Sequence, residues 1–453
     1  MRRAAYILIF LELIQERNGD MFLGLWDTFI HTLLGIPNIA LPIKVRLIDF
    51  IVICLLLVAR GRPGAQKMRA KPMDKAMFAS LATIVVTEIW GIVINGGNFK
   101  VTFVQLRPFI IMQVTAFFLI AVLRTPRDFH GLGKVILAAA FWRALMCLWF
   151  YLFVARQMDP IPPYMTTHFD SVTFVVGILI LCSYALEFRT GKAILAAFLG
   201  SAVLLVAIQL NNRRLAFISL FAGLAVLYAL FPSNRAKRTL NRYIVPTVGL
   251  YLAIGLGTGA TKGPFKPLAA ISTSGGAAAA QDSSARARDM ENMGVILLLT
   301  KSPLLSTGWG HEYTPVTRAY TVEEGFAETW SIPHNNMLMI VCFNGMLGFM
   351  GIWIIFPVCV FFNARAYRAA SAPIERVAAA TSIAALVVYW NQVFGDMGFI
   401  NYDNIPIVAS AIAVCSRLSV YTGGWPEKGK SMSAAPAQRG PAKVTAAQPG
   451  APA

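Results

Sequence analysis

Two adjacent arginines form the first candidate site in the sequence. The tetrapeptide NNRR, which ends in Arg213 and Arg214, is the whole connection between two apolar stretches, 192–210 and 215–232. If both stretches are membrane helices, the arginines lie on the side where basic residues are otherwise scarce. Guanidinium groups bind phosphate oxygens in a bidentate way, so this turn suits a diphosphate. The simpler alternative is that both arginines are solvated anchors at the headgroup surface.

A histidine stands at the entrance to a later apolar stretch. His334 lies in the sequence PHNN, directly before a predicted membrane helix, 335–361. An imidazole at the mouth of a membrane cavity, with an ordinary pKa of about 6.5, can accept a proton or donate a hydrogen bond to phosphate. The alternative is a capping or surface residue. Its neighbour Asn335 is a candidate supporting residue.

The connection 260–334 is unusually long, and loops of this length are usually functional. It contains Arg286 and Arg288, which are candidate phosphate ligands or else part of a solvated helix start. Two residues apart, they would face nearly opposite sides of a helix. His311 follows a GWG turn, and an acidic group comes later: Glu323, Glu324 and Glu328. We expect a flexible first part and then a helix, together forming a cap over the membrane domain.

Charged residues inside apolar stretches are functional candidates because lipid makes them costly. Arg46 with Asp49, spaced three residues apart, and Arg107 at the start of a span are most simply a structural pair and anchors that reach the membrane surface. Glu88 and Arg143 lie deeper. Pairing across helices would compensate their charges, but the sequence does not show their partners.

Several catalytic motifs are absent from the sequence: Asp-x-Asp, the Walker loop, His-Glu-x-x-His and Gly-x-Ser-x-Gly. Their absence disfavours a metal-bridged nucleotide-sugar transferase, an ATPase, a metalloprotease and a serine hydrolase. The six cysteines lie inside apolar stretches and lack the paired spacing of a metal site or a disulfide framework. We therefore expect neither a metal nor another cofactor.

The elements that must position these residues are membrane helices. Hydrophobic residues make up 57% of the 453 residues and charged residues 14%, against about 25% charged in soluble domains. Apolar stretches of about 18 residues or more recur, and in lipid their backbone must form helices or a closed barrel. Continuous hydrophobicity selects helices, so the predicted fold is all-α and polytopic. The net charge of +18 comes mainly from short basic loops, which disfavours nucleic acid as a partner.

About twelve membrane spans are predicted. The first lies somewhere within 4–37; it has a basic start but no cleavage site, so we expect it to be retained, in or partly across the membrane. The others are 39–59, 77–97, 103–123, 133–154, 171–187, 192–210, 215–232, 243–259, 335–361, 378–395 and 405–421.

Basic loops alternate with loops that are poor in Lys and Arg. The basic set is 60–75, 124–134, 189–192, 233–242 and 363–376. By the positive-inside rule this set is cytoplasmic, which places both termini in the cytoplasm and the long loop on the other side. The predicted parts are an N-terminal transmembrane bundle (1–259), a large, partly helical periplasmic loop (260–334), C-terminal transmembrane helices (335–423) and a disordered cytoplasmic tail (424–453).

The polar motifs of the second half follow one another in a recognisable order. Arg288 is followed four residues later by Asn292, then by an apolar helix, SPLLSTGWG (302–310), PHNNML (333–338) and the glycine-rich CFNGMLGFMGIW. The arginine turn precedes them, and WNQVFGDMG, which contains Asp396, follows. This order resembles the bacterial O-antigen ligase and O-antigen polymerase family. The first half of the chain matches that family only in topology.

The resemblance implies a glycosyltransferase of the bacterial inner membrane that works at the periplasmic face. Its donor would be an undecaprenyl diphosphate-linked glycan, its acceptor a glycan or a lipid-linked acceptor, and it would need no nucleotide and no metal. Arginines would then stabilise the departing diphosphate. Other polysaccharide assembly proteins and the lipid bilayer would be its partners.

The resemblance also implies roles for individual residues. Arg213 or Arg214, together with Arg288, would bind the donor diphosphate, and His334 would bind or activate at the reacting centre. Asp396 would be a supporting residue. The NNRR turn differs from the single arginine of many relatives, so the choice between its two arginines stays open.

A second choice within the loop also stays open. Asn292 stands where relatives often have an aromatic residue, which leaves Arg286 as the alternative to Arg288. Arg286 is therefore kept as a candidate supporting residue.

Other functions remain to be weighed. Within the family, ligases attach a finished glycan to lipid A core and polymerases join repeat units; similarity to the exopolysaccharide branch favours a polymerase. A transporter or flippase of lipid-linked oligosaccharide should show an internal repeat with paired broken helices, and no second copy of any segment is found. A non-catalytic scaffold would not require arginines at an outer turn together with a histidine-bearing loop.

Overall fold

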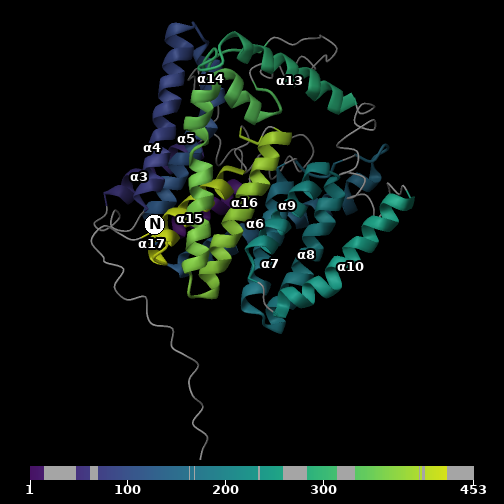
Figure 1. The fold of residues 1–453 in the computed structure, drawn as a ribbon. Helices are drawn as coiled ribbons and strands as arrows, with labels where there is room; N and C mark the ends of the chain where they lie inside the picture. Colours follow the sequence, from purple (N-terminus) through teal and green to yellow (C-terminus); the bar gives the residue numbers. More distant parts are fainter. Residues whose placement is uncertain are drawn as a thin grey trace, which may run out of the picture.

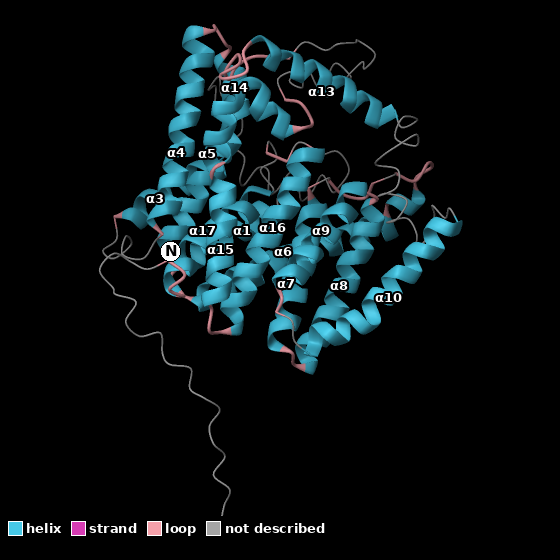
Figure 2. Cartoon of the chain, viewed as in Figure 1, coloured by secondary structure: helices cyan, strands magenta, loops and turns pink. Residues whose placement is uncertain are grey.

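The computed structural model shows a helical bundle with one helix lying across its end (Figures 1 and 2). It describes residues 1–14, 47–61, 70–162, 164–167, 169–232, 235–258, 283–313, 332–396, 398–399 and 404–425. Every regular element in these ranges is a helix. The all-α, polytopic class expected from the sequence is therefore confirmed.

The helices follow in this order: α1 Arg2–Ile14, α3 Leu47–Arg60, α4 Lys71–Ile89, the π-helical turn η1 Trp90–Ile94, α5 Phe99–Val122, α6 Pro126–Phe153, the short 3₁₀ turn η2 Ala155–Gln157, α7 Asp170–Phe188, α8 Gly191–Asn211, α9 Arg214–Leu230, α10 Arg235–Thr258, α13 Ser283–Lys301, α14 Asn336–Trp353, α15 Ile355–Ala369, α16 Pro373–Gly395 and α17 Ile405–Tyr421.

Lipid is the solvent around this bundle. Within the described ranges, seven helical stretches are long and apolar enough to cross a membrane, and α9 and α17 are shorter apolar helices. Large apolar side chains cover outward faces: Val93 and Phe198 are each 71% exposed. Such exposure is costly in water and normal in a bilayer. The predicted spans at 4–37 and 39–59 fall partly outside the described residues, so their extent stays a prediction.

The described part of the first helix is shorter than a membrane span. α1 has 13 residues, whereas a transmembrane helix needs about 20. It packs against the start of α6, where Arg2 Nη1 lies 2.7 Å from Asp128 Oδ1 and the Tyr6 hydroxyl donates to the Asp128 carbonyl at 2.9 Å. Asp128 also accepts hydrogen bonds from two backbone N–H groups at the start of α6, so one carboxylate caps α6 and anchors α1.

The centre of the bundle is formed by α16 and α17. α16 packs against α7, α9, α15 and α17, and α17 packs against α5 and α15 as well. Almost every residue of α17 is buried. Because α16 is held on several sides, the position of its last residue, Gly395, and of Asp396 after it is set by the core of the fold.

The span predicted over 335–361 overlaps the candidate span Asn336–Ala369, but its helix is interrupted by a kink. α14 is broken at Gly345, whose φ of 65° and ψ of −174° are not helical, and α15 begins after Trp353. An intramembrane break frees backbone groups that must find partners. The Met346 and Leu347 N–H groups donate to the carbonyls of Pro303 and Leu304, at 2.9 and 3.2 Å. The chain that follows α13 therefore completes α14.

Candidate functional site

The turn between α8 and α9 presents its arginines in different ways. Asn212 ends α8 in the left-handed conformation (φ 51°) that asparagine tolerates better than most residues. Arg213 then caps α9 with an extended backbone, and Arg214 is the first helical residue. The Arg214 side chain is exposed, whereas that of Arg213 turns inward. Of the two arginines, Arg213 is thus the inward-facing cation, and the choice of which one binds phosphate stays a prediction.

Asn211 holds this turn against a neighbouring segment. Its side chain is fully buried, accepts a hydrogen bond from the Thr166 N–H at 3.0 Å, and donates to the Thr167 carbonyl and Ser171 Oγ at 2.9 and 3.0 Å. The segment that it fixes carries Tyr164. One amide therefore determines how the α8–α9 turn meets the chain before α7.

Arg213 is a largely desolvated cation. Its guanidinium carbon lies 3.3 Å from the ring centroid of Tyr164, and its buried Nε has no hydrogen-bond partner among the described residues. Burial lowers the pKa of Arg213 to about 10, with Arg288 acting in the same direction and Tyr164 and Asp396 in the opposite one. The group remains cationic at neutral pH, with a donor left over for an anion.

Arg288 reaches the same place from α13. Its Nη1 donates to the carbonyl of Gly395, the last residue of α16, at 2.7 Å. Asp396 follows directly, is 7% exposed and accepts a hydrogen bond from Gln392 Nε2 at 3.4 Å. The structure thus brings together three residues predicted separately, Arg213, Arg288 and Asp396. The side chain of Arg286 lies outside the described residues, as do the acids Glu323, Glu324 and Glu328.

His334 is held by a carboxylate that sequence reasoning missed. Its Nδ1 lies 3.0 and 3.2 Å from the two carboxylate oxygens of Glu291, and its backbone N–H donates to the same carboxylate at 3.1 Å. The Tyr313 hydroxyl donates to Glu291 at 2.8 Å. One signal could have revealed Glu291: it follows Arg288 by three residues, so both lie on one helical face.

The ionisation of Glu291 defines the tautomer of His334. Burial alone would raise the pKa of Glu291, but hydrogen bonds and the charge of His334, with a further hydrogen bond from Tyr313, bring it below the usual value. Burial and Glu291 raise the pKa of Tyr313, which stays protonated and donates. Because an ionised carboxylate only accepts hydrogen bonds, Nδ1 of His334 must carry a proton. Nε2 is then the nitrogen available for chemistry, on a side chain that is 40% exposed.

Two asparagines next to His334 shape the backbone. The Asn335 side chain accepts from the Leu338 N–H at 3.1 Å and so caps α14. Asn336 donates to the Pro333 carbonyl and accepts from the Phe399 N–H, both at 2.8 Å. Asn336 therefore connects the chain around His334 with the chain that follows Asp396. The support predicted for Asn335 takes the form of a helix cap.

The SPLLSTGWG motif packs against helices instead of lining the site. Gly308 N–H donates to the Phe343 carbonyl at 2.7 Å, just before the break in α14. Trp309 is fully buried and donates from its indole to Thr87 Oγ1 at 2.9 Å. A side chain on Gly91 would lie 2.2 Å from the Trp309 carbonyl, so the turn fits only against a glycine. The motif is a structural bridge between α14 and α4.

His311 is less exposed than its place after the GWG turn suggests. The ring is half-buried, with Nε2 3.3 Å from the Gly91 carbonyl. The His311 carbonyl accepts from Gln105 Nε2 at 3.1 Å. Its contacts are with backbone groups of the bridge, away from the arginines described above.

Two further pairs of charges are buried and structural. Arg143 binds Asp170 with two hydrogen bonds of 2.6 Å, in a place where both side chains are almost fully buried. The partner of Arg143 is thus Asp170. Glu88, the other deep charged residue predicted from the sequence, belongs to a different helix, α4. Arg107 pairs with Asp49, a partner that the spacing in the sequence had assigned to Arg46; Arg46 itself lies outside the described residues. Buried pairs of this kind hold helices in register when every charge is matched.

The fold and these contacts define a class: a polytopic, all-α membrane protein in which two arginines, an aspartate and a histidine–glutamate pair gather at one end of the bundle. Residues 199–354 match the family model described as O-Antigen ligase. Over this region the chain is similar to the O-antigen ligase family, and the match supports a membrane enzyme of surface polysaccharide assembly. The matched region contains Arg213, Arg288, Glu291 and His334. A search of curated proteins found no match.

Proposed function

We propose that this protein is a glycosyltransferase of the bacterial inner membrane that transfers or polymerises glycan repeat units at the periplasmic face. Its donor is a glycan linked to undecaprenyl diphosphate. The proposal rests mainly on Arg213, a half-buried cation whose buried Nε has no hydrogen-bond partner among the described residues and which interacts electrostatically with Arg288 and Asp396. A diphosphate would supply negative charge beside the two guanidinium groups and acceptor oxygens for the unused donor of Arg213.

The chemistry follows from the groups around that anion. The hydroxyl oxygen of the acceptor forms a bond to the anomeric carbon of the donor sugar, and the bond from that carbon to the diphosphate breaks. Undecaprenyl diphosphate leaves with the electron pair, and Arg213 and Arg288 stabilise its charge. Nε2 of His334 accepts the proton of the attacking hydroxyl, while Glu291 stabilises the imidazolium that forms.

Arginines can replace a divalent cation in this scheme. A metal ion stabilises a leaving diphosphate through its positive charge, and two guanidiniums in a partly dry site offer the same charge with fixed directions. We therefore expect activity without added metal and without a nucleotide.

The decisive experiment uses the full-length protein in detergent or nanodiscs, with an undecaprenyl diphosphate-linked repeat unit as substrate and a chelator present. We expect glycan transfer, and the length of the product separates a polymerase, which extends the glycan, from a ligase, which needs a lipid A core acceptor. His334→Ala should lower the rate by about 10² to 10⁴-fold, the usual range for acid or base catalysis. A requirement for a divalent cation would overturn the arginine-based mechanism, and transport without bond formation would favour a flippase.

A further inference from the structure

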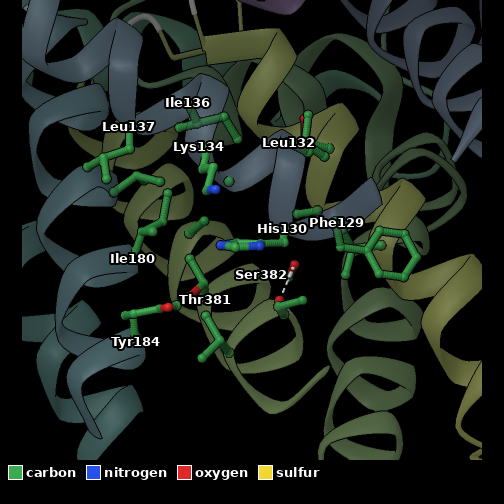
Figure 3. A pocket seen from close by; sticks show the side chains of 18 of the residues that line it. Phe129, His130, Leu132, Lys134, Ile136, Leu137, Ile180, Tyr184, Thr381 and Ser382 are labelled. Atoms are coloured by element: carbon green, nitrogen blue, oxygen red, sulfur yellow. Dashed lines mark hydrogen bonds between the residues drawn. The ribbon is translucent and has the colours of Figure 1, made fainter. Parts of the chain in front are cut away.

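A cavity lies in the half of the bundle remote from Arg213 and His334. It has a volume of about 330 Å³ and is enclosed mainly by α6, α7, α16 and α17 (Figure 3). It involves the first part of α6, the second half of α7 and the first half of α16, whereas the candidate active site lies at the other ends of α7 and α16. The two sites are therefore separate.

The cavity is apolar along most of its length and polar at one side. Its apolar walls include Leu137, Val176, Ile180, Ile407 and Val414. Figure 3 shows the side chains of His130, Lys134, Thr381 and Tyr184 grouped around one part of it. The rings of His130 and Tyr184 are stacked, with centroids 6.1 Å apart. A ligand that fits must be amphiphilic.

Two hydroxyl groups in the cavity lack partners. Thr381 Oγ1 and Ser410 Oγ make no hydrogen bond among the described residues, and Ser410 is only 3% exposed. A buried hydroxyl without a partner costs free energy. Both hydroxyls can donate to a ligand that brings acceptor oxygens, such as esters, into the apolar part of the cavity.

The rim faces lipid and is cationic. Lys134 is exposed, and α8 presents Ile194, Leu195 and Phe198 outward beside the rim residue Ala196. Arg124 and Arg127 lie exposed just before His130. Asp128, the acid in this stretch, is already paired with Arg2. The polar side of the cavity therefore attracts an anion that arrives from the bilayer.

We propose that this cavity binds an anionic glycerophospholipid from the leaflet opposite the candidate active site. Lys134 and His130 hold the phosphate, and an acyl chain enters between α6 and α16 toward α17. Thr381 and Ser410 donate to the ester oxygens. Basic pockets between membrane helices commonly bind anionic headgroups in this way. The proposal does not depend on the glycan-transfer reaction.

The test uses the full-length protein in detergent, with phosphatidylglycerol or phosphatidylcholine added, and reads out lipid adducts by native mass spectrometry together with the thermal unfolding midpoint. We expect phosphatidylglycerol to remain bound and to raise the midpoint more than phosphatidylcholine does. Lys134→Gln should weaken phosphatidylglycerol binding at least about tenfold, and Ala378→Leu, which fills the cavity without changing its charge, should also weaken it. Lys192→Gln, at the same end of the bundle but outside the cavity, should bind as the parent does.

Several results would overturn the proposal. The first is equal binding of the two lipids, and the second is unchanged binding by a Lys134→Gln/Ala378→Leu double variant with parental unfolding behaviour in lipid-free detergent. If the double variant does not fold, Lys134→Gln alone decides, because an exposed side chain can be changed without disturbing the core. Full displacement of the lipid by millimolar inorganic phosphate would also overturn it, because the site would then recognise only an anion and not a phospholipid.

Discussion

Glu291 gives His334 a defined role at the scale of single residues. A histidine before a membrane helix can be a cap or a surface residue, but here its Nδ1 faces an ionised carboxylate that is itself held by Tyr313. This arrangement leaves Nε2 as the ring nitrogen that Glu291 does not engage. A carboxylate in this position is expected when an imidazole accepts a proton during a reaction.

Replacing Glu291 by glutamine tests this role. Glu291→Gln removes the negative charge with little change in size, so the imidazolium loses its stabilising partner. We expect the turnover rate to fall at least about tenfold, or roughly 1.4 kcal/mol, with little change in the apparent affinity for the donor. Asp289→Asn, an exposed neighbour on α13, is the matched control. Parental turnover in Glu291→Gln, at normal protein level, would show that the carboxylate only supports the local structure.

The two arginines of the α8–α9 turn should differ in the same assay. Arg213→Lys keeps the charge but loses the planar fork and the stacking on Tyr164, so we expect a loss of more than about tenfold. Arg214→Lys should have a smaller effect because its side chain is exposed. Initial rates at subsaturating donor measure both. The opposite order would assign the donor site to Arg214, and full activity in both variants would return the pair to the role of membrane anchors.

At the scale of helices, the site depends on a break in α14 and on the segment that fills it. Carbonyl groups of the chain after α13 accept hydrogen bonds from the Met346 and Leu347 N–H groups. In the same segment, the Gly308 N–H donates to the Phe343 carbonyl. Since α13 carries Arg288 and Glu291 while α14 begins just after His334, these hydrogen bonds also set the distance between the two halves of the site. The SPLLSTGWG motif thus contributes to the site by holding its two halves in position.

Gly345 is the residue at which this bridge can be tested. A Cβ there would lie 2.2 Å from the Leu304 carbonyl carbon, and the backbone conformation is one that only glycine adopts readily. We expect Gly345→Ala to destabilise the protein by about 1–3 kcal/mol or more, seen as a lower thermal unfolding midpoint in detergent. Gly249→Ala in α10, where nothing lies within 4 Å of the added carbon, should leave the midpoint unchanged or raise it slightly, because alanine favours the helix. Equal midpoints for the two variants would contradict the packing described for the break.

At the scale of the whole molecule, the bundle has two chemically different ends. Arg213, Asp396 and His334 gather at one end, beside Arg288 and Glu291 of α13. The amphiphilic cavity and the described basic stretches 124–134, 189–192 and 363–376 belong to the other end. This asymmetry agrees with an enzyme whose reaction takes place outside the cytoplasm, since positive charge concentrates on cytoplasmic loops.

Reporter fusions test this orientation. A reporter that is active only outside the cytoplasm should be on when fused after Ser272, in the long loop, and off when fused after Arg238 or Lys443. The expectation rests on the alternation of basic and basic-poor loops. A cytoplasmic signal from the Ser272 fusion would remove the basis for a periplasmic active site, whatever the other two fusions report.

Much of the fold is determined by the sequence alone. Lipid requires continuous apolar helices, so the predicted stretches 171–187, 192–210 and 405–421 agree closely with α7, α8 and α17. Candidate functional residues could also be found from the sequence. A charged group near the membrane core costs free energy, so its presence there indicates a functional role. Arg213, Arg288, Asp396 and His334 were all visible as candidates.

Only the tertiary structure decided how these residues act. The inward direction of Arg213, the pairing of Glu291 with His334 and that of Arg143 with Asp170 depend on how each helix is rotated and against which neighbour it packs. The break at Gly345 depends on a backbone segment some 40 positions earlier in the chain that supplies its hydrogen bonds. Apolar stretches specify that a helix forms in lipid, but lipid solvates all faces of it equally. The direction in which each side chain points, and the neighbour that it meets, are therefore set by packing and polar contacts between segments far apart in the sequence.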